Sequence, residues 1–133
     1  RRRSPRKSLA ATVADAKLAL PFGEALIRGI LCNMLVVLAL IMAMLARDLV
    51  SKILCCVFPI MTFVACGFEH CVANMFLIPA GLLAKGMPLA DQWVMIRNLL
   101  PVTLGNIVGG LLILVLHPNR LRQLWQLYHH RPK

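Results

Sequence analysis

The residues most capable of chemistry lie together at positions 67–75, GFEHCVANM, where an acid, an imidazole and an amide interrupt an apolar stretch. The stretch is about 30 residues long, more than the roughly 20 that cross a bilayer as one straight helix. An ionisable side chain near the middle of a bilayer costs free energy, and it usually lines a polar path through the protein. With an unperturbed pKa of about 6.5, the His70 imidazole exchanges protons at physiological pH. We interpret this segment as the functional centre, with a purely structural histidine as the alternative.

Three neighbours of His70 are candidates for the same path. Helical spacing places Asn74, four residues later, on the face of the imidazole, and also Phe63, seven residues earlier. An aromatic at this spacing suits a hydrophobic gate, and a Phe that packs or faces lipid fits equally well. Adjacent helical residues diverge, so Glu69 need not touch His70. We expect its carboxylate to accept hydrogen bonds from backbone amides freed at a helix break.

The elements that must position these residues are membrane helices. Hydrophobic residues make up 59% of the chain and mean hydropathy is +0.75, above the roughly 45–50% apolar usage of soluble domains. Three apolar runs, residues 23–46, 53–84 and 98–117, predict an all-α integral membrane protein with three transmembrane helices. The middle run is too long for one straight helix and contains four breakers, so we predict that it is broken: Pro59, Gly67, Pro79 and Gly81.

The charges lie mostly outside these runs. The net charge is +10, and the basic residues gather at the two ends of the chain. Basic flanks beside apolar spans usually contact anionic lipid headgroups, so we expect membrane lipid and not nucleic acid as the partner. We predict a basic disordered leader at residues 1–12, a membrane domain at 13–117 and a basic cytoplasmic tail at 118–133. Lys and Arg divide almost evenly between the two sides and predict no orientation.

Polar residues also interrupt the first and third runs. Asn33 lies in the first run and Asn106 in the third, which suggests a polar seam shared by all three spans. Gly105 and Gly109 form a GxxxG pair, the spacing that lets two helix backbones approach closely. Glu24 and Arg28, spaced i,i+4, can neutralise each other near the membrane edge.

No catalytic constellation competes with this interpretation, so we expect neither an enzyme nor a cofactor. All five cysteines fall inside apolar runs, where packing is the favoured role. Cys71, beside His70, is the one candidate for a reactive thiol. His129 and His130 near the end of the chain are too few ligands for a metal site. A small redox or metal-binding membrane protein is the weaker alternative.

The motif GFEHCVANMFLIPAGLL, followed by VTLGNIVGG, resembles the fifth and sixth spans of the formate/nitrite transporter family. Residues 16–33, from Ala16-Lys17 to ILCN, resemble the fourth span. The resemblance extends over about residues 13–116. It implies one inverted repeat of a six-span, aquaporin-like channel of the bacterial inner membrane. Such channels assemble as pentamers, with an anion pore in each protomer.

The resemblance also implies roles for individual residues. His70 matches the central pore histidine, which exchanges a proton with the passing anion or steadies its charge. Phe63 matches a constriction aromatic, and Lys17 matches a vestibule lysine that attracts anions. A polar network around them is implied at Glu69, Asn33, Asn74 and Asn106. The implied substrates are small monovalent anions, formate first and nitrite second.

The resemblance covers three of the six spans. We expect transport to require a separately made N-terminal half or self-association. The alternative is a truncated, non-transporting remnant that acts as a membrane-inserted interaction or assembly piece through Gly105 and Gly109. One half alone is expected to leave its polar side chains facing lipid without partners, namely Asn33, Glu69, His70 and Asn106.

Overall fold

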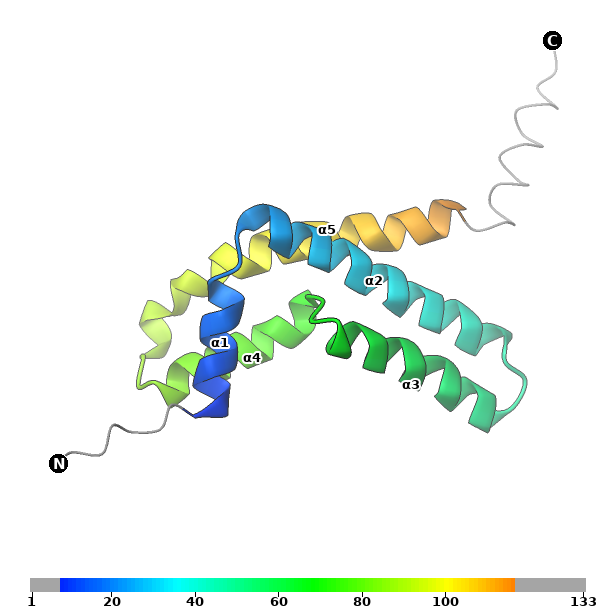
Figure 1. The fold of residues 1–133 in the computed structure, drawn as a ribbon, viewed down its shortest axis with the longest axis horizontal. Coiled ribbons are helices and arrows are strands. Elements are labelled where there is room, and N and C mark those ends of the chain that lie inside the picture. Colours follow the sequence, from blue (N-terminus) through cyan, green and yellow to red (C-terminus); the bar gives the residue numbers. More distant parts are fainter. Residues whose placement is uncertain (1–7, 117–133) are drawn as a thin grey trace, which may run out of the picture.

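The computed structural model describes residues 8–116, and every regular element in this part is a helix (Figure 1). The elements are α1 (Leu9–Leu18), α2 (Phe22–Leu45), α3 (Leu49–Ala65), α4 (Cys71–Ala84), the 3₁₀ helix η1 (Leu89–Met95) and α5 (Ile96–Leu116). Helices α2 and α5 pack side by side, α3 returns along α2, and α1 packs across α4. The predictions for residues 1–7 of the leader and for the tail at 118–133, with its two histidines, lie outside the described residues.

Two helical stretches are long and apolar enough to cross a membrane, Phe22–Leu45 and Ala90–Leu116. The first matches the predicted run 23–46 within one residue at each end. The second begins before the predicted residue 98 because η1 continues directly into α5. Helices α3 and α4 are also apolar but have only 17 and 14 residues, fewer than the roughly 20 of a straight span.

Side-chain caps explain why α1 and α3 begin earlier than predicted. Ser8 Oγ accepts a hydrogen bond from the backbone N–H of Ala11, so residues 9–12, expected in a disordered leader, are helical. Asp48 caps α3 by accepting from both the N–H and the hydroxyl of Ser51, at 2.8 and 2.6 Å. These two bonds hold the pKa of the Asp48 carboxyl below its usual value. Helix α3 therefore begins at Leu49 and not at residue 53.

The predicted break is present between α3 and α4. Of the four residues predicted to cause it, only Gly67 lies between these two helices. Gly67 has a φ of +65°, the left-handed conformation that ends helices. The N–H of Phe68 bonds to the carbonyl of Phe63, and the N–H of Gly67 bonds to that of Val64. This pair of bonds is a Schellman motif, which satisfies the last carbonyls of α3. The two prolines and the second glycine lie inside α3 and α4: Pro59, Pro79 and Gly81.

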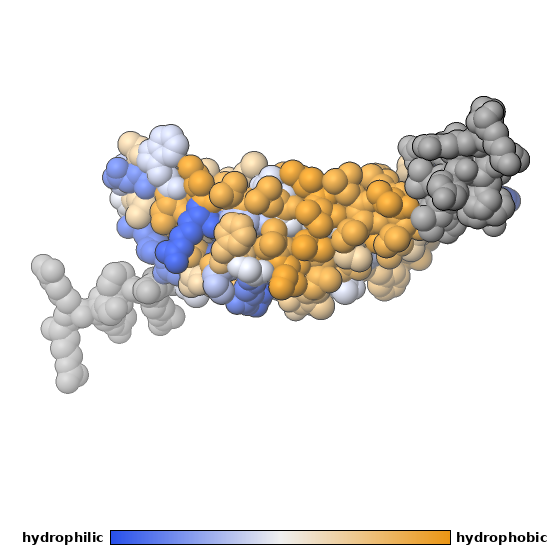
Figure 2. Space-filling model, turned by 90° about the horizontal axis from the view of Figure 1, so that it is seen from above, coloured by the Kyte–Doolittle hydropathy of each residue, from blue (hydrophilic) through white to orange (hydrophobic). Residues whose placement is uncertain are grey.

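Glycines let the helices touch backbone to backbone. A Cβ on Gly29 would lie 2.8 Å from the carbonyl oxygen of Val102, and one on Gly109 would overlap the carbonyl of Ile30. The α2–α5 crossing therefore depends on residues without side chains. Outside this core, most large apolar side chains are exposed. Figure 2 shows a broad hydrophobic surface over the middle of the molecule, with hydrophilic residues gathered toward one end.

Candidate functional site

The carboxylate of Glu69 is the centre of a buried polar cluster. Its Oε1 accepts a hydrogen bond from Lys17 Nζ of α1 at 2.9 Å, and its Oε2 accepts one from Asn74 Nδ2 of α4 at 2.5 Å. Asn98 of α5 bonds to the same amide, and we call these four residues the Glu69 cluster. Glu69 is only 4% exposed. Because a buried charge needs a partner, the Lys17 ammonium is what makes this position tolerable.

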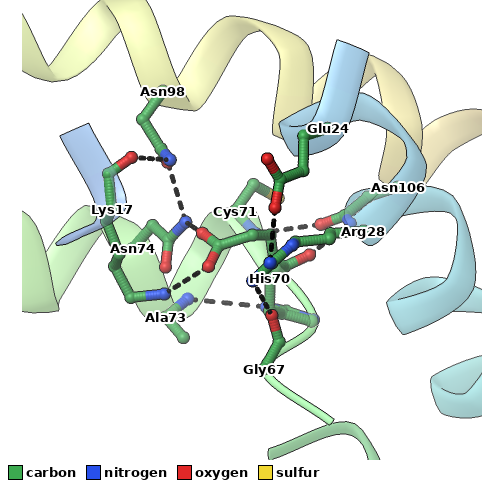
Figure 3. Close-up of polar contacts among 11 residues, drawn as sticks. Lys17, Glu24, Arg28, Gly67, His70, Cys71, Ala73, Asn74, Asn98 and Asn106 are labelled. Carbon is green, nitrogen blue, oxygen red and sulfur yellow. Dashed lines mark hydrogen bonds and ion pairs between the residues drawn. The ribbon is translucent and has the colours of Figure 1, made fainter. Parts of the chain in front are cut away.

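Asn98 ties α5 to the two helices on which Lys17 and Asn74 lie. Its Oδ1 accepts from Asn74 Nδ2 at 2.8 Å, and its Nδ2 donates to the backbone carbonyl of Lys17 at 2.8 Å (Figure 3). Asn74 therefore uses its amide nitrogen twice, while its Oδ1 is buried with no partner among the described residues. An orphaned buried acceptor costs about 1–3 kcal/mol. The two donated bonds outweigh that cost and set the orientation of the amide.

The break between α3 and α4 is held by a second asparagine, Asn106 of α5. Its Nδ2 donates to the carbonyls of Gly29 and Glu69, at 2.8 and 3.0 Å. Its Oδ1 accepts from the N–H of Cys71 at 2.9 Å, which satisfies an amide at the start of α4. Asn33 of α2 donates to the backbone carbonyl of Asn106 at 2.6 Å. A single side chain thus joins α2, the break and α4.

Helix α2 braces the other edge of the break. Arg28 donates from Nη1 to the carbonyl of Gly67 at 3.1 Å and from Nη2 to Glu24 at 2.5 Å. The predicted pairing of Glu24 with Arg28 is confirmed. The backbone carbonyl of Arg28 also accepts from the N–H of Glu69 at 3.3 Å. The loop that carries Glu69 and His70 is therefore bonded to its neighbours by both backbone and side chains.

His70 lies on the open side of the same loop and is only half-buried. It is the N-cap of α4, where its Nδ1 accepts from the N–H of Ala73 at 3.4 Å. Its ring stacks on that of Phe63, with centroids 6.1 Å apart and planes 24° apart. Because Nδ1 acts as an acceptor, the proton of the neutral ring is on Nε2. Among the described residues, Nε2 has no hydrogen-bond partner.

The structure brings the predicted residues together, with two corrections to their contacts. Glu69 does not bind backbone amides at the break, because Lys17 and Asn74 occupy both of its carboxylate oxygens. Asn74 turns toward Glu69 and not toward His70, because His70 is the N-cap of α4 and its extended backbone takes its side chain out of the helical pattern. Phe63 does reach His70, across the break.

The prediction that four polar side chains of this half lack partners is wrong, because each of the four takes part in a hydrogen bond within the chain. Glu69, Asn74 and Asn106 are buried and bonded within the chain, and Asn33 donates a hydrogen bond. The reason is that α1, α2 and α5 each place a side chain in hydrogen-bond contact with the break. Lys17, expected as a vestibule cation, has its charge balanced by Glu69.

Asn98 is a site residue that the sequence did not reveal, because it is the first residue of the predicted run 98–117, where a polar side chain needs no explanation. The available signal was spacing. Asn98 precedes Gly105 by seven residues and Val102 by four, so it continues the stripe of α5 that faces the other helices. Within residues 8–116, no three His, Cys, Asp or Glu side chains lie close enough together to hold a metal ion.

The chain is similar in sequence to known transport proteins. The family profile described as formate/nitrite transporter matches residues 3–118. The uncharacterized transporter YrhG of Bacillus subtilis (strain 168) is 47% identical over 98 residues, which cover 74% of this chain and 36% of YrhG. The formate channel FocA of Escherichia coli (strain K12) is 39% identical over 114 residues, covering 73% of this chain and 40% of FocA.

A solved structure, a pentameric formate channel with formate bound, matches the fold. Its TM-score is 0.68 and its sequence identity 34%, over 90% of this chain and 51% of that chain. The chain spans only 36% and 40% of the length of YrhG and FocA. Since the family profile matches most of the sequence and the helices are apolar, this membrane protein belongs to the formate/nitrite transporter family.

Proposed function

We propose that the protein takes part in the transport of small monovalent anions, with formate as the first candidate and nitrite as the second. The observation that carries the proposal is His70 Nε2 at the α3–α4 break, which has no hydrogen-bond partner within residues 8–116. The names of the relatives support the substrate class, because FocA is a formate channel and the structural relative holds formate.

The ring of His70 is prepared to meet an anion. Its Nδ1 is occupied by Ala73, so the neutral ring presents an N–H at Nε2 to an arriving ligand. The N-terminus of α4, which begins at the next residue, adds a partial positive charge. Moving a bare anion through hydrocarbon is prohibitive. A titratable group at this point could give a proton to the anion, so that a weak acid would pass in its neutral form. The position of His70 at the break supports this role.

The other predicted pathway residues divide into two roles in this proposal. Phe63, stacked on the ring, narrows the path beside His70. Lys17, Glu69 and Asn74 support the loop from behind, and so do Asn33 and Asn106. Lys17 attracts anions only weakly in this arrangement, because Glu69 balances its charge. Its main role is to hold the Glu69 carboxylate in place.

We propose that α3 and α4 together make a third crossing, broken at residues 66–70, between the spans of α2 and α5. The chain would then be one three-span repeat in a bacterial inner membrane. Its exposed apolar side chains leave room for contacts with lipid, an N-terminal half and further copies. A pentamer is the assembly to test first, because the structural relative is pentameric.

Formate uptake into proteoliposomes tests the proposal, at pH values on either side of about 6.5, the unperturbed pKa of histidine. The full chain is reconstituted alone and together with the N-terminal part of FocA. We expect uptake above that of empty vesicles, and a ratio between the two pH values that His70→Asn changes. Gln92→Ala, a buried amide far from the break in sequence, is the matched control.

An unchanged pH ratio in His70→Asn would remove the role assigned to the imidazole. Absence of uptake in both preparations, with membrane insertion demonstrated, would overturn the transport proposal. It would favour the alternative, a membrane-inserted assembly piece that transports nothing. Uptake only in the presence of the FocA segment would mean that the site is present here and that the pore needs a second half.

A further inference from the structure

Two amide side chains form a directed chain of hydrogen bonds between α1, α5 and α4. The chain begins at the backbone carbonyl of Lys17, which accepts from Asn98 Nδ2 at 2.8 Å. It continues from Asn98 Oδ1 to Asn74 Nδ2 at 2.8 Å and ends at Glu69 Oε2 at 2.5 Å. Figure 3 shows the amide of Asn98 between the backbone carbonyl of Lys17 and the amide of Asn74.

The two ends of this chain dictate its direction. A backbone carbonyl can only accept, so Asn98 must turn its Nδ2 toward Lys17 and its Oδ1 toward Asn74. That oxygen then requires a donor, so Asn74 must present its nitrogen. The second N–H of the same nitrogen reaches Glu69 Oε2, and Glu69 is left as an acceptor at both oxygens. The buried, unpartnered Oδ1 of Asn74 is the consequence of this enforced orientation.

Asn98 does not serve as a helix cap. Both of its side-chain bonds go to other helices, one to α1 and one to α4, and it lies at the third residue of α5. It is 1% exposed, so water does not compete for its amide. Its side chain therefore acts on the Glu69 cluster and not on its own helix.

We propose that Asn98 is a positioning residue that orients the Asn74 amide and thereby holds the Glu69 carboxylate against Lys17. The effect on transport rests on the proposed function, whereas the effect on the amides does not. The Asn98 carbonyl oxygen is the essential group, because it is what turns the Asn74 nitrogen toward Glu69.

Side-chain amide resonances test the orientation directly, in the full chain with ¹⁵N-labelled asparagine in detergent micelles. The five asparagines, Asn33, Asn74, Asn98, Asn106 and Asn119, give few enough signals to assign by substitution. In Asn98→Leu, which keeps the branched shape of the side chain and removes both bonds, we expect the Asn74 amide protons to lose their low-field shift. The Asn106 signals should stay in place, which shows that the fold around the break is retained.

Asn98→Asp is the rescue variant, because a carboxyl group buried beside Glu69 stays protonated, keeps an acceptor oxygen for Asn74 and donates its O–H to the carbonyl of Lys17. It should retain the Asn74 shift. Two results would overturn the proposal: an unchanged Asn74 shift in Asn98→Leu, or its loss in Asn98→Asp with the Asn106 signals in place. A packing role alone predicts the first of these.

Transport supplies the second readout. Asn98→Leu should lower formate uptake by about tenfold, the effect of losing a hydrogen bond that supports a charged group. In a Glu69→Gln background the same substitution should add little, because both changes act through one carboxylate. Additive losses in the double variant would overturn the assignment. If the unsubstituted protein takes up no formate, the proposed function fails while the amide test still decides the role of Asn98.

Discussion

Glu69 and His70 are neighbours in the sequence and have opposite surroundings. Glu69 is 4% exposed and bonds to side chains of α1 and α4, with α5 close behind. His70 is half-buried, with a long bond to Ala73 and a stacked Phe63, both close to it along the chain. Side chains of this chain therefore hold the loop at Glu69, whereas the imidazole of His70 stays partly exposed.

This difference indicates how the work is divided in the site. A buried charge with fixed partners is rigid and holds the loop, whereas a half-exposed ring with one free nitrogen can meet a ligand. Side chains that support the loop should therefore be needed for stability, and His70 should be needed for chemistry. Three substitutions test this division, each paired with a control in the same chain.

Removing the carboxylate should have the largest effect. Glu69→Ala leaves the Lys17 ammonium, whose side chain is only 15% exposed, without its partner, which costs about 3 kcal/mol, the low end of the range for a broken buried ion pair. His70→Ala should cost about 1 kcal/mol or less, because it removes one weak hydrogen bond and one ring contact. Unfolding in detergent micelles measures both. Similar losses for the two substitutions would contradict the division between support and chemistry.

The second test removes the side chain that joins three parts of the loop support. Asn106→Ala deletes the hydrogen bonds to Gly29 and Glu69 and the one from Cys71, at roughly 1 kcal/mol each. We expect a loss of about 3 kcal/mol in the free energy of unfolding. Asn33→Ala removes one bond and should lose about a third as much. Equal losses would mean that the three bonds do not act together.

The third test widens the contact between α2 and α5, the helix that carries Asn106. A methyl group on Gly109 overlaps the carbonyl of Ile30, so Gly109→Ala must push α2 and α5 apart. We expect destabilisation by about 2 kcal/mol, within the usual cost of overpacking. Gly23→Ala, where a Cβ meets nothing within 4 Å, should change stability by about 0.5 kcal/mol or less. A stable Gly109→Ala protein would show that the crossing tolerates a wider spacing.

Much of the fold was predictable because it depends on local signals. The apolar run of α2 matches its helix within one residue, and Gly67 ends α3 by its own left-handed backbone. Cap residues were present in the sequence too, although Ser8 and Asp48 were not used to place the helix starts. Pro59 and Pro79 did not indicate where the break lies, because each is accommodated inside a helix, Pro59 in α3 and Pro79 in α4.

The partners of the site residues were less predictable. Lys17 and Glu69 are 52 positions apart, and Asn98 bonds to Lys17 across 81 positions. No periodicity along one helix contains that information. Lys17 was expected as a vestibule cation and Glu69 as a member of a polar network, so their pairing was not predicted, and neither was the bridging role of Asn98.

The sequence by itself determined that this is a helical membrane protein with a break in its middle apolar run and polar groups around it. Hydrophobic runs, a left-handed glycine and the high cost of a buried charge are properties of residues and short segments. Only the tertiary structure decided which groups satisfy one another. Hydrogen bonds and ion pairs need atoms within about 3 Å, and that proximity arises only after the glycine-lined crossings bring distant helices together.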